Sequence, residues 1–200
     1  MPMTHRAALE VLAAHRGNRI VITTMTAISI WPQLSDIPVD FAYIPSAMGQ
    51  GPSLGLGLAL AQPRRGVIAV CGDGSMLMNL GALVTIAAQP ANLFVIIIDN
   101  GLYEVTGGQP TAGAGRTDWA GLARAAGIRR VYAFDSEPRW RSGASEALGG
   151  TGPAVIVLSV EGRIGCKTPA PPRPMSEQIK RLQQALGVPA VTTHRIAEQK

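Results

Sequence analysis

A carboxylate and a side-chain amide follow two apolar runs of the chain. Asp73 comes directly after the run Val67–Cys71, within the hexapeptide VCGDGS, and Asn100 comes directly after the run Leu93–Asp99. The 27 positions that separate Asp73 from Asn100 are the length of one helix-plus-strand crossover. Ligand sites of open parallel sheets lie beyond the carboxyl ends of the strands, so we expect both side chains to face one site.

The residue types around Asp73 predict an anion site that contains a divalent cation. Gly72 and Gly74 let the backbone turn tightly, and the amides at the start of the following helix point toward an anion. A carboxylate in that position repels an anion unless a cation lies between them, and Mg²⁺ commonly joins one or two protein oxygens to phosphate oxygens. Asn100 offers an amide oxygen, and a turn through the next glycine directs the Leu102 carbonyl at the same ion.

The elements that must position these residues alternate along the chain. Short runs rich in Val and Ile alternate with stretches rich in Ala and Leu, which is the pattern of βαβ units around a parallel sheet. The near-continuous apolar character of the runs indicates central strands covered on both faces, so the predicted fold class is α/β. The predicted strands are Arg19–Thr24, Asp40–Ile44, Val67–Cys71, Leu93–Asp99, Arg129–Phe134 and Ala154–Ser159. The predicted helices are Thr4–His15, Thr26–Leu34, Gly51–Ala61, Ser75–Ala88, Asp118–Ala126 and Pro138–Leu148.

The amino-acid composition of the chain changes after Glu161. The segment Lys167–Pro174 is too rich in proline for a helix or a strand, whereas Met175–Leu186 has apolar positions at helical spacing. We therefore predict one domain over residues 1–162, followed over residues 163–200 by a proline-rich linker and a C-terminal helix and tail, with the helix packing on a neighbour.

Composition excludes several classes of protein. The net charge of +5 invites a nucleic-acid interpretation, but the basic residues are scattered, so we expect no nucleic-acid partner. No apolar stretch approaches the length of a membrane span and the N-terminus lacks a signal peptide, so we expect a cytoplasmic protein with no membrane partner. Cys71 and Cys166 are expected to be ordinary reduced thiols. His5, His15 and His194 are expected to be solvated and without a role.

The stretch from Gly72 to Asn100 resembles the GDG…N motif of thiamine diphosphate-dependent 2-oxo-acid decarboxylases and acetohydroxyacid synthases. The resemblance extends upstream to Ala47-Met48-Gly49 and downstream to the run Tyr103–Thr111, which is most similar to sulfopyruvate and phosphonopyruvate decarboxylases. It covers residues 20 to 160 in all. It implies a three-layer α/β/α fold around a mainly parallel six-stranded sheet, with residues 1–162 as the diphosphate-binding (PP) domain.

The resemblance also implies the ligands of the site. Mg²⁺ would be bound by Asp73, Asn100 and the carbonyl of Leu102, and the cofactor would be thiamine diphosphate, bent over Met48. Members of the family often have glycine where this chain has Met25. As a loop carboxylate, Glu104 is either solvated or in contact with cofactor or substrate. The implied cofactor-binding residues are Thr24, Thr26, Ser46, Ala47, Met48, Gly49, Gly72, Asp73, Gly74, Ser75, Asn100, Leu102, Tyr103 and Glu104.

The family uses one further group, a glutamate that protonates the aminopyrimidine ring from a pyrimidine-binding module. That module typically precedes the diphosphate-binding one, and here only about twenty residues precede the first predicted strand. The resemblance therefore implies a separate pyrimidine-binding (alpha) subunit and a hetero-oligomer such as a dimer of heterodimers, with no catalytic residue in this chain. The implied substrate is a small 2-oxo acid, and Gln50 stands where the sulfopyruvate and phosphonopyruvate enzymes often have His.

Three alternatives stay open on the sequence. The first is a carboligase subunit, because the residues do not distinguish protonation of the carbanion left after loss of CO₂ from its attack on a second carbonyl. The second is a non-catalytic cofactor-binding module with the same fold. The third is a dinucleotide-binding domain, which is disfavoured because Leu77 follows where the GxGxxG motif needs its third glycine.

Overall fold

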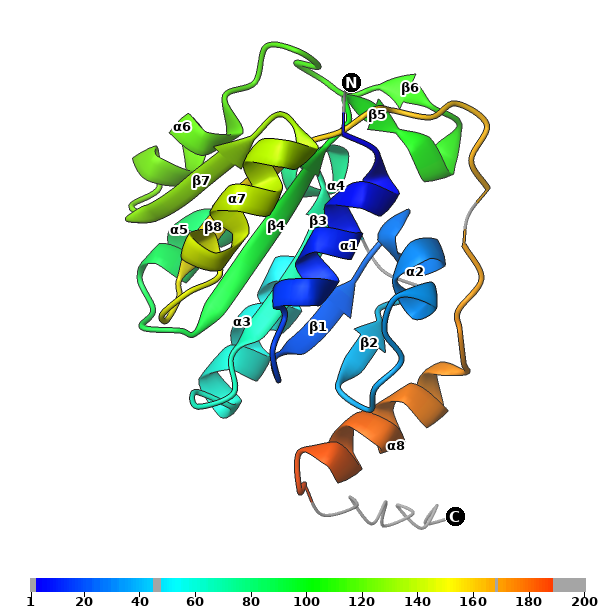
Figure 1. Cartoon of the computed structure of the whole chain (residues 1–200), viewed down its shortest axis with the longest axis vertical. Helices are drawn as coiled ribbons and strands as arrows, with labels where there is room; N and C mark the ends of the chain where they lie inside the picture. Colours follow the sequence, from blue (N-terminus) through cyan, green and yellow to red (C-terminus); the bar gives the residue numbers. More distant parts are fainter. Residues whose placement is uncertain (1–2, 45–47, 168, 189–200) are drawn as a thin grey trace, which may run out of the picture.

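The computed structural model describes residues 3–44, 48–167 and 169–188. Over these residues, six parallel strands form a central sheet in the order β2-β1-β3-β4-β8-β7 (Figure 1). The strands are β1 Ile20–Thr23, β2 Asp40–Ala42, β3 Val67–Gly72, β4 Leu93–Asp99, β7 Arg130–Phe134 and β8 Ala154–Ser159. A two-stranded antiparallel hairpin lies apart from the sheet and comprises β5 Leu102–Tyr103 and β6 Gln109–Pro110. The predicted α/β class and its six strands are confirmed.

Helices cover both faces of the sheet (Figure 1). One face is covered by α1 His5–His15, α2 Ala27–Ile30 and α7 Glu137–Ala147, and the other by α3 Gly51–Ala61, α5 Gly81–Ala87 and α6 Trp119–Ala125. Successive residues of a strand point to opposite faces. In β3, Ile68 and Val70 therefore join one apolar core while Val67 and Ala69 join the other. This arrangement explains why the strands are apolar throughout.

Two predicted helices are wrong in extent. The helix expected over Ser75–Ala88 is divided into α4 Asp73–Leu77 and α5, and the side chain of Asn79 in the intervening turn donates to the Gly49 carbonyl at 3.0 Å. The helix expected over Thr26–Leu34 continues beyond α2 only as the 3-10 helix η1 Trp31–Gln33, because a proline at position 32 has no backbone N–H to continue an α-helix.

The strand order creates a crevice between β1 and β3. From β1 the chain crosses to β2 on one side, whereas the sheet strands that follow β3 in the chain, namely β4, β7 and β8, all lie on the other side. The loops that leave the carboxyl ends of β1 and β3 therefore diverge. Open α/β sheets bind their ligands at such a switch point.

The terminal helix α8 Met175–Ala185 lies along the β2 edge of the sheet (Figure 1). The Ala42 backbone N–H donates to the Gln178 side chain at 2.9 Å, and Leu182 is buried in the core. Arg181 forms an ion pair with Asp36 at 3.1 Å. The expected helix is present and packs on β2 of this chain, and its packing on a neighbour stays a prediction. Across the described segments, no helix combines the length and apolar character needed to cross a membrane.

Candidate functional site

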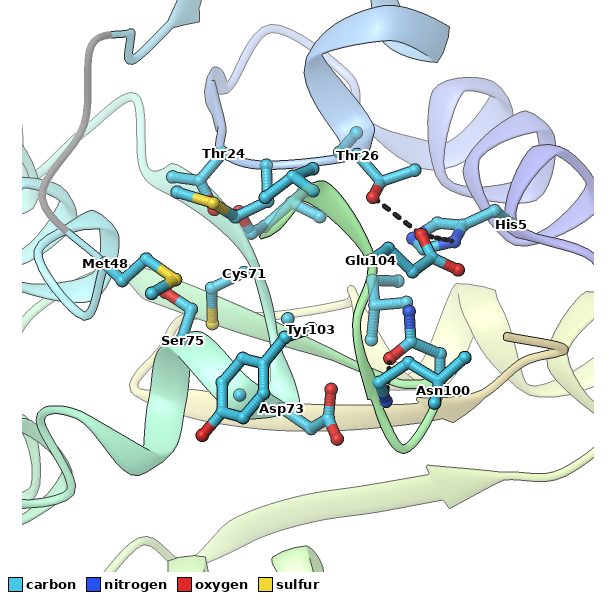
Figure 2. Close-up of a pocket in the computed structure, with 18 of the residues that line it drawn as sticks. His5, Thr24, Thr26, Met48, Cys71, Asp73, Ser75, Asn100, Tyr103 and Glu104 are labelled. Carbon is cyan, nitrogen blue, oxygen red and sulfur yellow. Dashed lines mark hydrogen bonds and ion pairs between the residues drawn. The ribbon is translucent and has the colours of Figure 1, made fainter. Parts of the chain in front are cut away.

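A pocket opens at the carboxyl ends of β1, β3 and β4 (Figure 2). Three loops form its walls: the loop Thr24–Thr26 after β1, the start of α4 after β3, and the turn after β4 that leads into the 3-10 helix η2 Glu104–Thr106. Most of the predicted site residues line this pocket. They are Thr24, Thr26, Met48, Gly72, Asp73, Gly74, Ser75, Asn100, Leu102, Tyr103 and Glu104.

Asp73 is the first residue of α4 and its side chain is buried, with the residue only 1% exposed. Thr111 donates its hydroxyl to Oδ2 of Asp73 at 2.9 Å, but Oδ1 has no hydrogen-bond partner among the described residues. Burial raises the pKa of this carboxyl above its usual value, against the lowering effects of the Thr111 hydroxyl and of the backbone N–H groups of Gly74, Gly101 and Asp73 itself. A buried acceptor without a partner is costly. Oδ1 therefore fits the role of a cation ligand.

Asn100 lies in the turn that follows β4 and lines the same pocket as Asp73. Gly101 has a φ of +69°, the left-handed region that favours glycine, and the Leu102 N–H donates to Oδ1 of Asn100 at 2.9 Å. Burial and then the charge of Asp73 raise the pKa of Asp99 as well, whereas a hydrogen bond with Trp119 lowers it. The two side chains that the sequence paired do share one cavity.

The predicted ligand set contains one carboxylate, one amide oxygen and one backbone carbonyl. Such oxygen atoms suit Mg²⁺, which usually keeps several water or phosphate ligands of its own. A cluster of three or more His, Cys, Asp or Glu side chains suited to a metal ion is absent from the described part of the chain. That the metal is held by Asp73, Asn100 and Leu102 stays a prediction.

Ser75 connects the pocket to the loop that precedes α3. The Gly49 N–H donates to the Ser75 hydroxyl oxygen at 2.8 Å, and Gly49 itself has a φ of +87°. A Cβ atom at Gly49 would lie 2.8 Å from the Cβ of Asn79, so only glycine fits there. This contact brings Met48 to the pocket wall. The predicted contacts of Ser46 and Ala47 fall outside the described residues.

Gly74 and Tyr103 are in close contact across the pocket. A Cβ atom at Gly74 would lie 2.4 Å from a ring carbon of Tyr103. The second glycine of the motif is therefore required by the packing of the ring from the β5 strand, in addition to any approach of a ligand to the backbone.

The loop Thr24–Thr26 is held by its two hydroxyl groups. Thr24 donates to the Val70 carbonyl at 2.9 Å, and Thr26 donates to Oε2 of Glu104 at 2.7 Å. Met25 between them has a φ of +51°, which is unusual for a residue with a side chain. Glycine would adopt this angle without the strain that a side chain causes.

Glu104 and His5 meet at the end of the pocket opposite Met48 (Figure 2). Glu104 is 3% exposed and His5 is 6% exposed, so the expectation that His5 is solvated was wrong, as was the solvated alternative for Glu104. The Nδ1 atom of His5 lies 3.8 Å from Oε2 of Glu104. Burial lowers the pKa of His5, Glu104 opposes this effect, and Arg163 adds to it.

Sequence reasoning missed His5 because nothing near it in the chain marks it as part of a site. It is the first residue of α1, after the helix cap Thr4. Its partner Glu104 comes from a distant loop, and only the packing of α1 on the sheet brings the two together. His15 forms a hydrogen bond within its own helix, to the Val11 carbonyl at 2.9 Å, and His194 falls outside the described residues.

Cys71 also lines the pocket, directly before the motif. Burial raises the pKa of its thiol to about 12, so the thiol stays protonated near neutral pH and is a poor nucleophile. This finding agrees with its interpretation as an ordinary reduced thiol.

Comparison with protein families identifies one domain. Residues 31–158 match the model described as "Thiamine pyrophosphate enzyme, C-terminal TPP binding domain". This range contains the loops after β3 and β4 and the described part of the loop before α3.

The chain is similar to decarboxylases of two kinds. It is 39% identical to a phosphonopyruvate decarboxylase of Streptomyces viridochromogenes over 78% of this chain and 40% of the relative. It is 35% identical to the beta subunit of a sulfopyruvate decarboxylase of Methanococcus maripaludis over 78% of this chain and 84% of the relative. The alignments thus span about two fifths of the phosphonopyruvate decarboxylases, 40% and 44% for the two Streptomyces relatives, and most of that beta subunit.

The fold is also similar to solved structures. The benzoylformate decarboxylase of Polynucleobacter necessarius superposes with a TM-score of 0.67 at 21% identity, over 82% of this chain and 34% of that one. At this identity the similarity concerns the fold alone.

Proposed function

Because residues 31–158 match its cofactor-binding domain, the chain belongs to the thiamine pyrophosphate enzymes, and we propose that it supplies the diphosphate-binding side of a 2-oxo-acid decarboxylase active site. The observation that carries the proposal is the pairing of Asp73 and Asn100 in one pocket, with a buried oxygen of Asp73 that has no hydrogen-bond partner among the described residues. A Mg²⁺ ion bound there neutralises a carboxylate that would otherwise repel a diphosphate.

Each loop of the pocket then has a defined task. Asp73, Asn100 and the Leu102 carbonyl hold the metal ion, and Gly74 and Ser75 at the start of α4 meet the diphosphate. Met48 supports the cofactor from the opposite wall. When bound, thiamine diphosphate supplies an electron sink for the carbanion left by loss of CO₂, and the chain supplies orientation and electrostatics.

We further propose that a separate pyrimidine-binding subunit completes the site and provides the activating glutamate. The similar proteins that are named beta subunits support this proposal. Exposed apolar side chains on the surface of this chain also support the proposal. Leu60 on α3, Met78 before α5 and Val84 on α5 are 47%, 51% and 59% exposed, and α3 packs beside α5. Exposed apolar side chains on elements that pack beside one another are compatible with an interface on this side of the chain.

The substrate class proposed is a small 2-oxo acid, by similarity to the decarboxylases above. Product analysis distinguishes decarboxylation from carboligation: an aldehyde is expected when one 2-oxo acid is supplied, whereas a new carbon–carbon bond would contradict the proposal. Activity is expected only when this chain and its partner are mixed. Full turnover by this chain alone would contradict the two-subunit arrangement.

Calorimetry tests the cofactor site directly. Thiamine diphosphate is expected to bind in the presence of Mg²⁺ and to lose its affinity when a chelator removes the metal. Substitution Asp73→Asn should weaken binding by at least roughly a hundredfold, because losing even an outer-shell partner of a metal costs up to that much. The exposed Glu146→Gln is the matched control. Equal affinity of Asp73→Asn and wild type, or binding that is independent of Mg²⁺, would overturn the proposal.

A further inference from the structure

Glu104, in η2 at the end of the pocket, lies against three other segments of the chain. Its Oε2 accepts a hydrogen bond from the Thr26 hydroxyl at 2.7 Å, and its Oε1 accepts one from the Arg163 backbone N–H at 2.8 Å. The Nδ1 atom of His5 lies 3.8 Å from Oε2 (Figure 2). The donors come from the loop after β1 and from the segment after β8, and the imidazole comes from the start of α1.

Both oxygens of the Glu104 carboxylate are therefore used by the protein itself. A carboxylate repels a diphosphate unless a cation separates them, so this side chain is poorly suited to contact the anionic end of the cofactor. Its bonds instead connect the two walls of the pocket. One wall is the loop Thr24–Thr26, and the other is the turn that carries Asn100 and Leu102.

The segment after β8 packs closely against the turn that carries the predicted metal ligands Asn100 and Leu102. A Cβ atom at Gly162 would lie 2.6 Å from a methyl carbon of Leu102 and 2.8 Å from the Asn100 carbonyl oxygen. The next residue, Arg163, donates to Glu104. The Glu104 carboxylate therefore holds the segment after β8, and this segment packs against the turn that carries Asn100 and Leu102.

On the basis of the proposed function, we infer that Glu104 is a positioning residue that sets the separation of the two pocket walls, with Thr26 and the Arg163 N–H as its donors and His5 as its buried neighbour. It acts on cofactor affinity through Asn100 and Leu102 and does not touch the cofactor. Ordering these two loops in advance removes a cost that binding would otherwise carry.

The test measures the affinity of thiamine diphosphate with saturating Mg²⁺ by calorimetry, on the full chain together with its partner subunit, and the midpoint of thermal unfolding without ligand. Glu104→Leu removes both acceptors and is expected to weaken binding by about tenfold or more, the effect of losing hydrogen bonds to a charged group. Glu104→Gln keeps one acceptor and should restore part of the affinity. Glu161→Gln, an exposed carboxylate on the same covering segment, is the matched control and should bind as wild type does.

Thr26 distinguishes positioning from direct contact. Thr26→Val is expected to weaken binding, and Thr26→Ser, which keeps the hydroxyl, is expected to restore most of the affinity that Thr26→Val loses. Because Thr26 acts through Glu104, Thr26→Val combined with Glu104→Leu should be no weaker than Glu104→Leu alone. If the two losses multiply, Thr26 meets the ligand directly and the inference is overturned.

The same measurements distinguish a failure of the inference about Glu104 from a failure of the proposed function. Variants at Glu104 that unfold at a lower temperature yet bind with wild-type affinity would make Glu104 merely structural and overturn the inference while the proposed function stands. A wild-type complex that binds no thiamine diphosphate overturns both. If Glu104→Leu does not fold, Glu104→Gln and Thr26→Val decide the question by the same measurements. Slower ligand-free hydrogen exchange of the Arg163 amide in wild type than in Glu104→Gln is expected as an independent readout.

Discussion

Met25 carries a backbone angle that a side chain makes unfavourable. At a φ of +51° an L-residue is strained by about 1 kcal/mol or more relative to glycine, which reverses the usual advantage of alanine over glycine. We expect Met25→Gly to be more stable than Met25→Ala by about 1 kcal/mol. Urea unfolding of the two variants measures this difference. An alanine variant as stable as the glycine variant would indicate that the loop relaxes when the side chain is shortened.

His5 should make stability depend on pH. Burial lowers its pKa below the usual value of 6.5, opposed by Glu104 and assisted by Arg163, so the folded state prefers the neutral imidazole. As the pH falls below this value the unfolded chain takes up the proton first, and stability is lost down to the folded-state pKa. We expect the free energy of unfolding to decrease below about pH 6.5 in wild type and to decrease less in His5→Gln. Parallel pH profiles for the two proteins would contradict this assignment.

Residues that follow recognisable strands were predictable, and residues brought together by the packing of a helix on the sheet were not. Asp73 and Asn100 each follow a recognisable apolar run, so their meeting follows from the rules of parallel sheets. The contact of His5 with Glu104 has no such local signal, because it depends on how α1 lies against the sheet. The angle of Met25 likewise follows from its neighbours rather than from its type.

At the scale of elements, the strands followed from composition more faithfully than the helices did. β4 and β8 have the predicted bounds because their apolar residues serve two cores at once. The single helix predicted over Ser75–Ala88 failed because Asn79 bonds to Gly49 on another segment, a tertiary contact that outweighs helical periodicity.

Arg130 closes the C-terminal end of α7. Its guanidinium donates to the carbonyls of Glu146 and Ala147 in the last turn of α7, at 3.2 and 3.3 Å. It also donates to the carbonyls of Gly149 and Thr151 just beyond the helix, each at 2.7 Å. Carbonyls at a helix end need such donors. We expect Arg130→Lys to lower the free energy of unfolding by about 1–2 kcal/mol, because lysine cannot reproduce the planar fork.

Arg129→Lys is the matched control for this prediction, since Arg129 is the adjacent residue and is exposed. It should leave the unfolding curve unchanged. Equal curves for Arg130→Lys and wild type would mean that water replaces the guanidinium at this helix end.

At the scale of the whole molecule, α8 is part of the folded unit. Leu182 is 8% exposed and packs into the same core as β2 and α3. Leu182→Ala should lower the free energy of unfolding by about 2 kcal/mol or more in one cooperative transition. Gln184→Ala, exposed on the same helix, should not. A separate early transition in urea, seen only by hydrogen exchange in α8, would mean that the helix is attached but not integral.

Ligand binding at the buried Oδ1 atom of Asp73 should also affect how much of the protein a cell contains. A ligand that binds only the folded chain adds about 1.4 kcal/mol of stability for each tenfold excess over its dissociation constant. A metal ion bound by Oδ1, as proposed above, would have this effect, and bound thiamine diphosphate would add to it. Proteases degrade unfolded chains, so the steady-state abundance of this protein in a cell should rise and fall with the supply of thiamine diphosphate.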